Sequence, residues 1–299
     1  MNRDGRPKLA HAQLVIDFSA DPARGEQAIG QWFESGWRLL GGSLRDVADA
    51  QAAGTFVRGG KNFPYGVDAW LARVPCEGQS SNGAPYDPQE WRRFLNDARR
   101  GGAQIHDISV YEMAWSDVDG RPAKGVDISP RMLSIRCVRR HVDGREFVLL
   151  SLEAPRTNLL DAAEHEATLS TFFRRAADQA GPLFGQIGFD YGIYSMTGLE
   201  YRLYIQPQES IREVGQVLRG YSWVTVLPDI LVDRLGGGQQ LVDSGAFIAV
   251  DRLSSGSWWL QAADTAAGYT NDHAKRVFRA LRPVLPAKAY ASTFEADLR

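Results

Sequence analysis

The middle of the chain contains three predicted β-strands, and the turn between the last two restricts the fold more than any other feature. The strands are expected at Gln104 to Trp115, Met132 to Arg139 and Glu146 to Leu152. The connection between the last two contains Asp143-Gly144, a pair that favours the tight turn of a β-hairpin. Because a hairpin joins neighbouring antiparallel strands, this region is predicted to be an antiparallel meander.

Two long helices are predicted on either side of the meander. The first begins after Asp87, which caps the helix, has Pro88 at its first position and ends at Gly101-Gly102. The second runs from Thr157 or Asn158 to Ala180 and is closed by Gly181-Pro182. Apolar residues recur in both at helical spacing, which indicates that one face of each helix packs on a sheet.

The remaining patterns complete the predicted fold class. Tyr201 to Ile205 and Tyr221 to Val226 are expected to be further strands, whereas Gly41 to Gly66 is rich in glycine and only weakly patterned. Because helices do not alternate with single strands, a doubly wound parallel sheet is disfavoured. The predicted class is α+β, with antiparallel sheets covered by helices.

The length of 299 residues allows two domain arrangements of the predicted strands and helices. One is a pair of αβ halves, residues 1–125 and 126–299, and the alternative is one continuous domain. Both halves run strand, helix, strands and helix, which is typical of an internal duplication. No residue-level repeat aligns between them, so similarity of the halves stays an alternative.

Charge, hydropathy and cysteine usage exclude several classes of partner. The net charge is −2 and the basic residues form no block, so no nucleic-acid partner is expected. No apolar run reaches membrane-spanning length, and Met1 to Gln13 lacks the apolar core of a secretory signal. Cys76 and Cys137 have no disulfide or zinc spacing. A cytoplasmic protein with no membrane association is therefore expected.

Motifs for metal, nucleotide and covalent chemistry are incomplete. His165-Glu166 begins a zincin pattern, but Leu169 stands where the second histidine is required. Gly236 to Gly238 follow a predicted helix instead of preceding one, so they do not form a phosphate-binding loop. Gly59-Gly60-Lys61 lacks the Walker spacing. We therefore expect no metal and no cofactor, and no catalytic residue is assigned from a motif.

One pair of neighbouring residues is a candidate for acid–base chemistry. His106-Asp107 stands at the start of a predicted strand, and a carboxylate close to an imidazole can tune its pKa toward neutrality. With Tyr191 or Tyr201 in a cleft between the two halves, this pair is the basis of one functional hypothesis, an enzyme of an unfamiliar class that acts on a small molecule.

Aromatic residues are concentrated in the last hundred residues. Tyr221, Trp223, Trp258 and Trp259 are the candidates for a binding surface, because tryptophan and tyrosine dominate interface hot spots. Trp258 and Trp259 are consecutive on a predicted strand, so their side chains should point to opposite faces of the sheet. Packing under the long helix is the alternative role for these side chains.

The segment from Leu218 to Ala262 resembles a known class of bacterial protein. It contains LRGYSWVTVLPDILVDRLGG, followed closely by LVDSGAFIAVDRLSSGSWWLQA. This arrangement of strand, proline, helix and glycines, followed by a hairpin, is similar to the C-terminal part of uncharacterised bacterial proteins related to the immunity proteins of type VI and contact-dependent toxin systems. The resemblance covers the C-terminal third and carries over no functional residue.

What this resemblance implies is a cytoplasmic binding protein that neutralises a cognate protein toxin by covering its active site. Such a protein needs no catalytic motif, and its affinity comes from a few aromatic and charged anchors. Three hypotheses therefore follow from the sequence: an immunity-type binding protein, an enzyme that uses His106 and Asp107, and an assembly subunit with an apolar surface. Oligomeric state is open in each of them.

Overall fold

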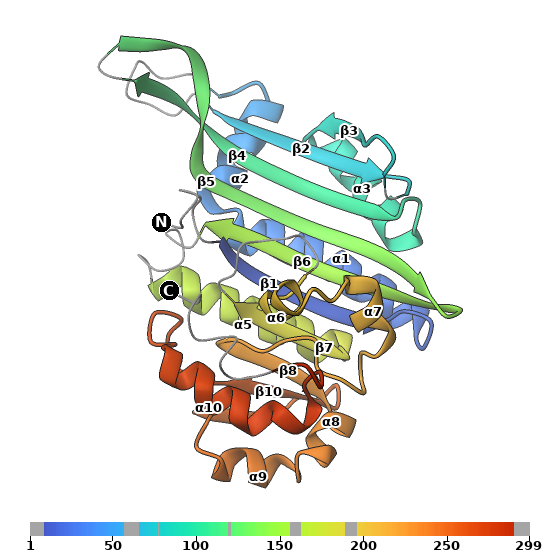
Figure 1. Ribbon diagram of the computed structural model, residues 1–299. Coiled ribbons are helices and arrows are strands. Elements are labelled where there is room, and N and C mark those ends of the chain that lie inside the picture. The colour runs from blue at the N-terminus through green and yellow to red at the C-terminus, as the bar shows by residue number, and fades with distance from the viewer. Residues whose placement is uncertain are drawn as a thin grey trace.

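The computed structural model describes residues 9–56, 66–76, 78–118, 121–155, 163–188 and 196–289. Within these residues the chain forms one ten-stranded sheet in which all neighbouring strands are antiparallel. Its order is β3-β2-β4-β5-β6-β1-β7-β8-β10-β9 (Figure 1). The strands are β1 Leu9–Asp17, β2 Val67–Val74, β3 Asn82–Pro85, β4 Ile105–Val118, β5 Arg121–Val142, β6 Arg145–Pro155, β7 Phe184–Gly188, β8 Val224–Pro228, β9 Ala249–Arg252 and β10 Ser257–Gln261.

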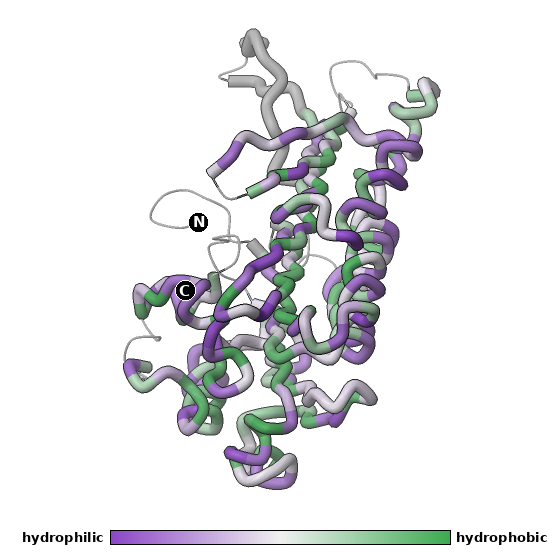
Figure 2. The backbone as a smooth tube through the Cα atoms, turned by 90° about the vertical axis from the view of Figure 1, so that its right-hand side faces the viewer, coloured by the Kyte–Doolittle hydropathy of each residue, from purple (hydrophilic) through white to green (hydrophobic). Residues whose placement is uncertain are grey.

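Helices cover both faces of the sheet, which Figure 2 shows nearly edge-on. The first face carries α1 Pro22–Leu40, α2 Gly42–Ala52, α3 Pro88–Arg100 and α5 Ala163–Ala180. The second face carries α6 Gly198–Leu203, α7 Pro207–Arg212, α8 Asp229–Arg234, α9 Gly238–Asp243, α10 Asn271–Leu281 and the 3₁₀ turn Arg282–Val284. The predicted α+β class, with helices on antiparallel strands, is confirmed. None of the described helices is both long enough and apolar enough to cross a bilayer.

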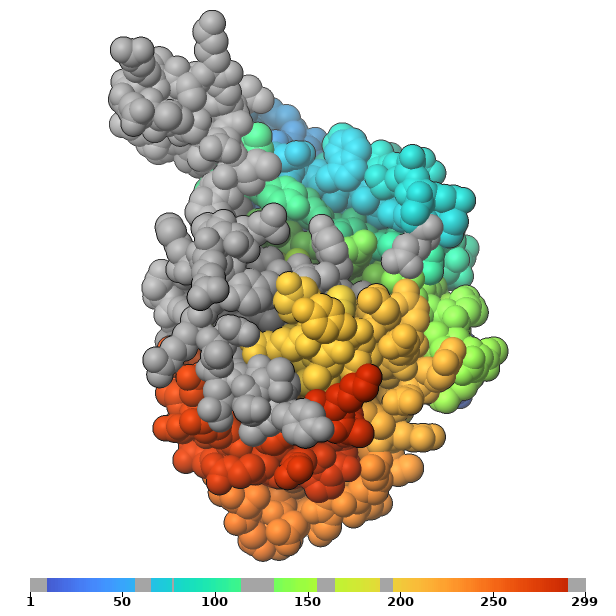
Figure 3. Space-filling view, viewed as in Figure 1, coloured from blue at the N-terminus to red at the C-terminus, as the bar shows by residue number. Residues whose placement is uncertain are grey.

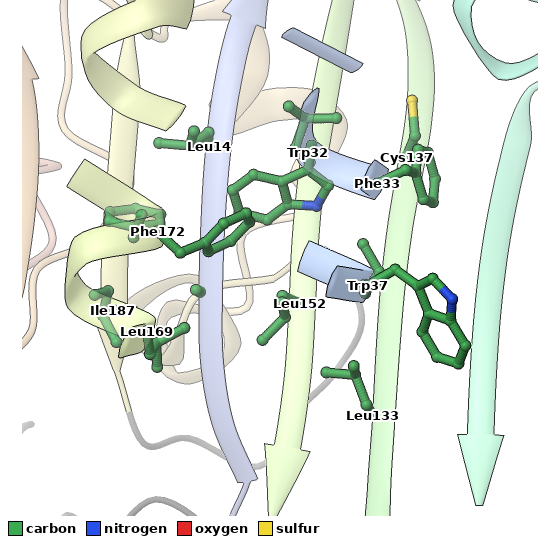
Figure 4. Packing of buried hydrophobic residues seen from close by; sticks show 14 of the residues in the cluster. Leu14, Trp32, Phe33, Trp37, Leu133, Cys137, Leu152, Leu169, Phe172 and Ile187 are labelled. Atoms are coloured by element: carbon green, nitrogen blue, oxygen red, sulfur yellow. The ribbon is translucent and has the colours of Figure 1, made fainter. Parts of the chain in front are cut away.

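The core on the first face is organised around α1. Trp32 is fully buried, lies 4.9 Å from Phe172 of α5 between ring centres, and donates a hydrogen bond of 3.2 Å from Nε1 to the Ser151 carbonyl of β6. Leu14 of the central strand β1 belongs to the same cluster (Figure 4). The next residue, Val15, belongs to the core of the second face, because successive side chains of a strand point to opposite sides. A single central strand therefore serves both cores.

The predicted helix after Asp87 is confirmed in detail. The Asp87 carboxylate accepts hydrogen bonds from the backbone N–H groups of Gln89 and Glu90, at 2.7 and 2.9 Å. Gly101 ends α3 with φ at 77°, a left-handed conformation that glycine adopts without the steric cost of a Cβ. The hairpin turn at Asp143-Gly144 is also present and joins β5 to β6.

One stretch without a predicted element is helical, and one local prediction is wrong. The glycine-rich stretch after Gly41 contains α2, whose Leu44 and Ala48 reach the core of the first face. The predicted strand from Tyr201 to Ile205 is instead the end of α6, because Thr197 and Glu200 cap that helix reciprocally. Capping prevails over the strand preference of the aromatic and branched residues from Tyr201 to Ile205.

The predicted division between residues 125 and 126 falls inside β5. The sheet continues through this point, with β5 pairing to β4 on one side and β6 on the other. Trp32 of α1 also packs against α5, which lies on the far side of the division. How many units unfold independently stays a prediction.

Candidate protein-binding surface

Two of the four aromatic residues proposed for binding lie in the core. Trp223 and Trp259 are each 1% exposed. The indole N–H of Trp223 donates to the Ala263 carbonyl at 2.7 Å, and Trp259 lies 6.1 Å from Phe173 of α5 between ring centres. A partner that leaves the fold intact cannot reach either side chain, so packing accounts for both.

The other two are half-buried on the second face. Trp258 donates from Nε1 to the Asp229 carboxylate at 2.6 Å, and its ring lies so close to Gly238 that a side chain there would collide with it. Tyr221 packs 6.2 Å from Phe278 of α10. Trp258 and Trp259 thus point to opposite faces of the sheet, as predicted. The hydrogen bond of Trp258 links β10 to the start of α8.

Among the described residues, the most exposed aromatic side chains lie at the end of α6. Tyr201 is 52% exposed and Tyr204 is 89% exposed. Tyr204 also has a left-handed backbone, with φ 53° and ψ 36°, which is costly for a residue with a large side chain. This conformation ends α6, since it lets the N–H of Ile205 donate to the Glu200 carbonyl at 3.0 Å. Figure 3 shows α6 and α7 (yellow) on the outer surface of the second face.

A buried ion pair holds α6 in place. The Arg219 guanidinium contacts the two carboxylate oxygens of Glu200, with 2.7 Å from Nε to Oε1 and 3.1 Å from Nη2 to Oε2. Both side chains are at most 1% exposed. Thr197 Oγ1 donates to the Arg219 carbonyl at 2.8 Å and accepts from the Glu200 N–H at 3.1 Å. The short helix that carries the two tyrosines is therefore rigidly attached to the body of the protein.

The sequence did contain a signal for this surface. Thr197-x-x-Glu200 has the spacing of a capping box, which predicts a helix start and opposes a strand through Tyr201. Burial of Arg219 and exposure of Tyr204 depend on the tertiary fold, so no local pattern could have indicated them.

The proposed acid–base pair is separated by the sheet. His106 is fully buried on the first face beneath α3, where its Nε2 lies 2.9 Å from the Asp97 carboxylate. Asp107 points to the second face, where its Oδ1 accepts hydrogen bonds from Ser109 and Ser134 at 2.7 and 3.3 Å. Burial raises the pKa of Asp107 above its usual range. Adjacency in sequence therefore places these two groups on opposite sides of β4.

Of the two tyrosines in the enzyme hypothesis, one lies in the described part of the chain. Tyr201 lies on α6, at the surface of the second face. Tyr191 lies outside the described residues.

His106 gives the protein a defined pH dependence. Burial lowers the pKa of His106 below its usual value, against the opposing effect of Asp97. The unfolded chain therefore takes up a proton below about pH 6.5, before the folded protein does, and stability falls as the pH is lowered. We expect His106→Gln to lose less stability than the wild type between pH 7.5 and 5.5 in urea unfolding.

The exposed His141 supplies the control for that experiment. His141→Gln leaves the contact of His106 with Asp97 intact, so the contribution of His106 to the pH dependence should persist in this variant. Parallel curves for the wild type and His106→Gln would contradict the assignment.

Polar side chains from five strands meet on the second face. In the sheet register Asp107, Arg136, Ser151, Gln13 and Gln186 are successive neighbours from β4 to β7. The adjoining row on the same face contains Ser109, Ser134, Glu153 and His11. We call these nine residues the polar rows.

Gln13 stands out within the polar rows. It is 1% exposed, and its side-chain amide has no hydrogen-bond partner among the described residues. A buried amide without a partner costs stability unless water or a ligand satisfies it. Sequence patterns could not indicate the polar rows, because their members are brought together only by strand order.

No cluster of metal-ligating side chains occurs in the part of the chain that the structure describes. The polar rows and the α6 tyrosines are two distinct features of the second face. One carries hydrogen-bonding and titratable groups, and the other offers exposed aromatic area.

Comparison with known proteins gives a likeness in fold. No protein-family model and no curated protein matches the sequence. Among solved structures, the Pseudomonas aeruginosa T6SS protein PA0821 superposes with a TM-score of 0.51 at 12% sequence identity. The match covers 93% of this chain and 76% of that one, so it extends well beyond the C-terminal third whose sequence suggested a resemblance. At this identity, the likeness shows that the two chains share a fold.

Proposed function

We propose that this chain is a binding protein of the immunity type, which neutralises a cognate bacterial toxin by covering it. The observation that carries the proposal is the pair Tyr201 and Tyr204, exposed on a helix that a buried ion pair holds rigidly. Rigid aromatic side chains bind partners at a low entropic cost, because little motion is lost on binding. A cytoplasmic location, where an arriving toxin would be met, is part of the proposal.

Two further observations support this proposal. The segment from Leu218 to Ala262 resembles proteins related to toxin immunity, and it includes Arg219, the residue that anchors α6. The structural neighbour is a T6SS protein, which belongs to the same kind of secretion system as the resemblance suggests.

The first test is capture of the partner from the native host with tagged wild-type protein, followed by mass spectrometry. A captured protein supports the proposal only if it is toxic when expressed alone and harmless when this chain is co-expressed. A chain that is purified alone, or a captured protein without toxicity, would contradict the proposal.

Tyr204→Gly separates binding from folding. Glycine adopts the left-handed conformation without strain, so the free energy of unfolding should stay unchanged or rise by about 1 kcal/mol. Binding should weaken by about 2 kcal/mol, which is roughly 30-fold in Kd, if Tyr204 is an interface anchor. Calorimetry of the purified pair gives the affinity, and urea unfolding gives the stability.

Trp70 of β2 provides the matched control, since it is also a partly exposed aromatic residue, at 41%. Trp70→Ala should leave the affinity unchanged. An equal loss of affinity in both variants, or none in Tyr204→Gly, would place the binding surface elsewhere.

The polar rows favour a second candidate function, an enzyme that acts on a small polar molecule. They bring carboxylates, an imidazole, a guanidinium and the unpartnered Gln13 amide to one face. A screen of polar metabolites for an increase in melting temperature tests it. A metabolite that stabilises the wild type but not Gln13→Leu would favour the enzyme hypothesis. A screen that finds no such compound would contradict this hypothesis.

A further inference from the structure

A hollow lined with arginines lies between α5 and the turn that joins β9 to β10. Its volume is about 360 Å³. The lining residues are Thr171, Arg174, Arg175, Asp178, Arg252, Leu253 and Ser254. We call it the α5 notch. It lies apart from α6, and none of its residues belongs to the polar rows.

The walls of the α5 notch are fixed by specific contacts. The lining residues from α5 stand at positions 171, 174, 175 and 178, which is the i, i+3, i+4, i+7 pattern of one side of a helix. Ser254 on the opposite wall donates hydrogen bonds from its N–H and Oγ to the Asp178 carboxylate of α5, at 2.6 and 2.8 Å. The turn is thereby held against α5, and the hollow between them is preformed.

Two of the three arginines are held in place. The Arg174 guanidinium lies 5.3 Å from the ring centre of the buried Trp259 and forms an ion pair of 2.8 Å with Asp251. Arg252 forms an ion pair of 2.6 Å with Asp229. Asp229 is itself fixed, because it also accepts from the Trp258 indole. Each guanidinium has five N–H donors, and each of these pairs leaves most of them available.

Arg175 is different from the other two. It is exposed, and it forms no ion pair with any residue in the described ranges. Asp251 and Asp229 balance the charges of Arg174 and Arg252, and Asp178 adds a carboxylate to the lining itself. The α5 notch thus has no excess of positive charge, but it offers the donors of one guanidinium, that of Arg175, without an ion-pair partner among the described residues.

These features select an anionic ligand of limited size. Planar guanidinium groups match the oxygens of carboxylates and phosphates, which they can bind through two parallel hydrogen bonds. The volume is near the lower end of the range for small-molecule sites, about 300 to 1,000 Å³. We propose that the α5 notch binds a small oxyanion through Arg175, with Arg174 and Arg252 as preplaced partners. The carboxylate or phosphate can belong to a free metabolite or to an acidic side chain of another protein.

Titration calorimetry at low ionic strength tests the proposal with three probes: citrate, inorganic phosphate and a blocked tripeptide of glutamate. We expect saturable binding of at least one probe, weakened by added salt. A preference for citrate or phosphate identifies a free anion, and a preference for the tripeptide identifies an acidic protein segment. Arg175→Gln should weaken binding about tenfold, because one charge-assisted hydrogen-bonding group is removed.

Arg212 of α7 provides the control, because it is an exposed arginine in an ordinary surface ion pair with Asp143. Arg212→Gln should bind the probes as the wild type does. Absence of saturable binding for all three probes would overturn the proposal, and so would equal weakening in Arg175→Gln and Arg212→Gln. Neither outcome bears on the tyrosines of α6, so this inference and the proposed function fail separately.

Discussion

Replacing Glu200 by alanine should lower the free energy of unfolding by about 3 to 5 kcal/mol. The change leaves the guanidinium of Arg219 without its carboxylate in a place where the side chain is 0% exposed. A buried charge that loses its partner pays the full cost of leaving water. Thr197 would also lose the carboxylate that accepts its backbone N–H at 2.6 Å. Urea unfolding followed by circular dichroism measures the difference.

Two variants make this expectation specific. Arg99 and Glu34 form an ion pair with the same 2.7 Å distance, but their side chains are 35% and 50% exposed. Glu34→Ala should therefore cost less than about 1 kcal/mol. The double variant Glu200→Leu with Arg219→Met should recover most of the loss, because it removes both charges together. Equal effects of Glu200→Ala and Glu34→Ala would show that burial is not the cause.

The same ion pair matters for function, because it determines where α6 lies. If α6 detaches in Glu200→Ala, then Tyr201 and Tyr204 lose their fixed positions and binding should weaken together with stability. The double variant distinguishes the two roles. The double variant should restore stability. It should restore binding only if apolar packing of the two new side chains holds α6 in the same position as the ion pair does.

Much of the fold could be predicted from the sequence wherever the signal is local. The cap at Asp87, the stop at Gly101 and the turn at Asp143-Gly144 depend on neighbouring residues alone, and the structure confirms all three. The α+β class follows from these elements, since a hairpin enforces antiparallel strands. Strand order could not be predicted, because β1 pairs with β6 and β7, which are far away in the sequence.

Local patterns failed where tertiary contacts decide. Aromatic and branched residues from Tyr201 onward favour a strand, whereas the local capping box of Thr197 and Glu200, stabilised by the buried contact of Glu200 with Arg219, makes this segment helical. The sequence allows both a binding surface and packing under the long helix for Trp223 and Trp259, and the structure buries both side chains. The candidate site shows the same limit, because exposure of Tyr204 and convergence of the polar rows are properties of the assembled sheet.

Trp32→Ala should also lower the free energy of unfolding by about 3 to 5 kcal/mol, and it addresses how many units the chain contains. Trp32 belongs to the predicted N-terminal half, yet it contacts Ser151 and Phe172 of the other half. If the chain unfolds as one unit, the variant should reduce the protection against hydrogen exchange equally at the backbone amides of Val110 in β4 and Val226 in β8.

Leu231→Ala is the matched experiment from the other side, because Leu231 is fully buried in the core of the second face. We expect this variant to lower the free energy of unfolding by about 2 to 5 kcal/mol. If the chain unfolds as one unit, the amides of β4 should lose protection against exchange as well. If the amides lose protection only in β8 and β10, the chain contains two units that unfold separately. Trp32 would then lie at the contact between these units. A single unit would mean that the α6 surface and the α5 notch depend on the whole sheet, so truncation at residue 126 would destroy both.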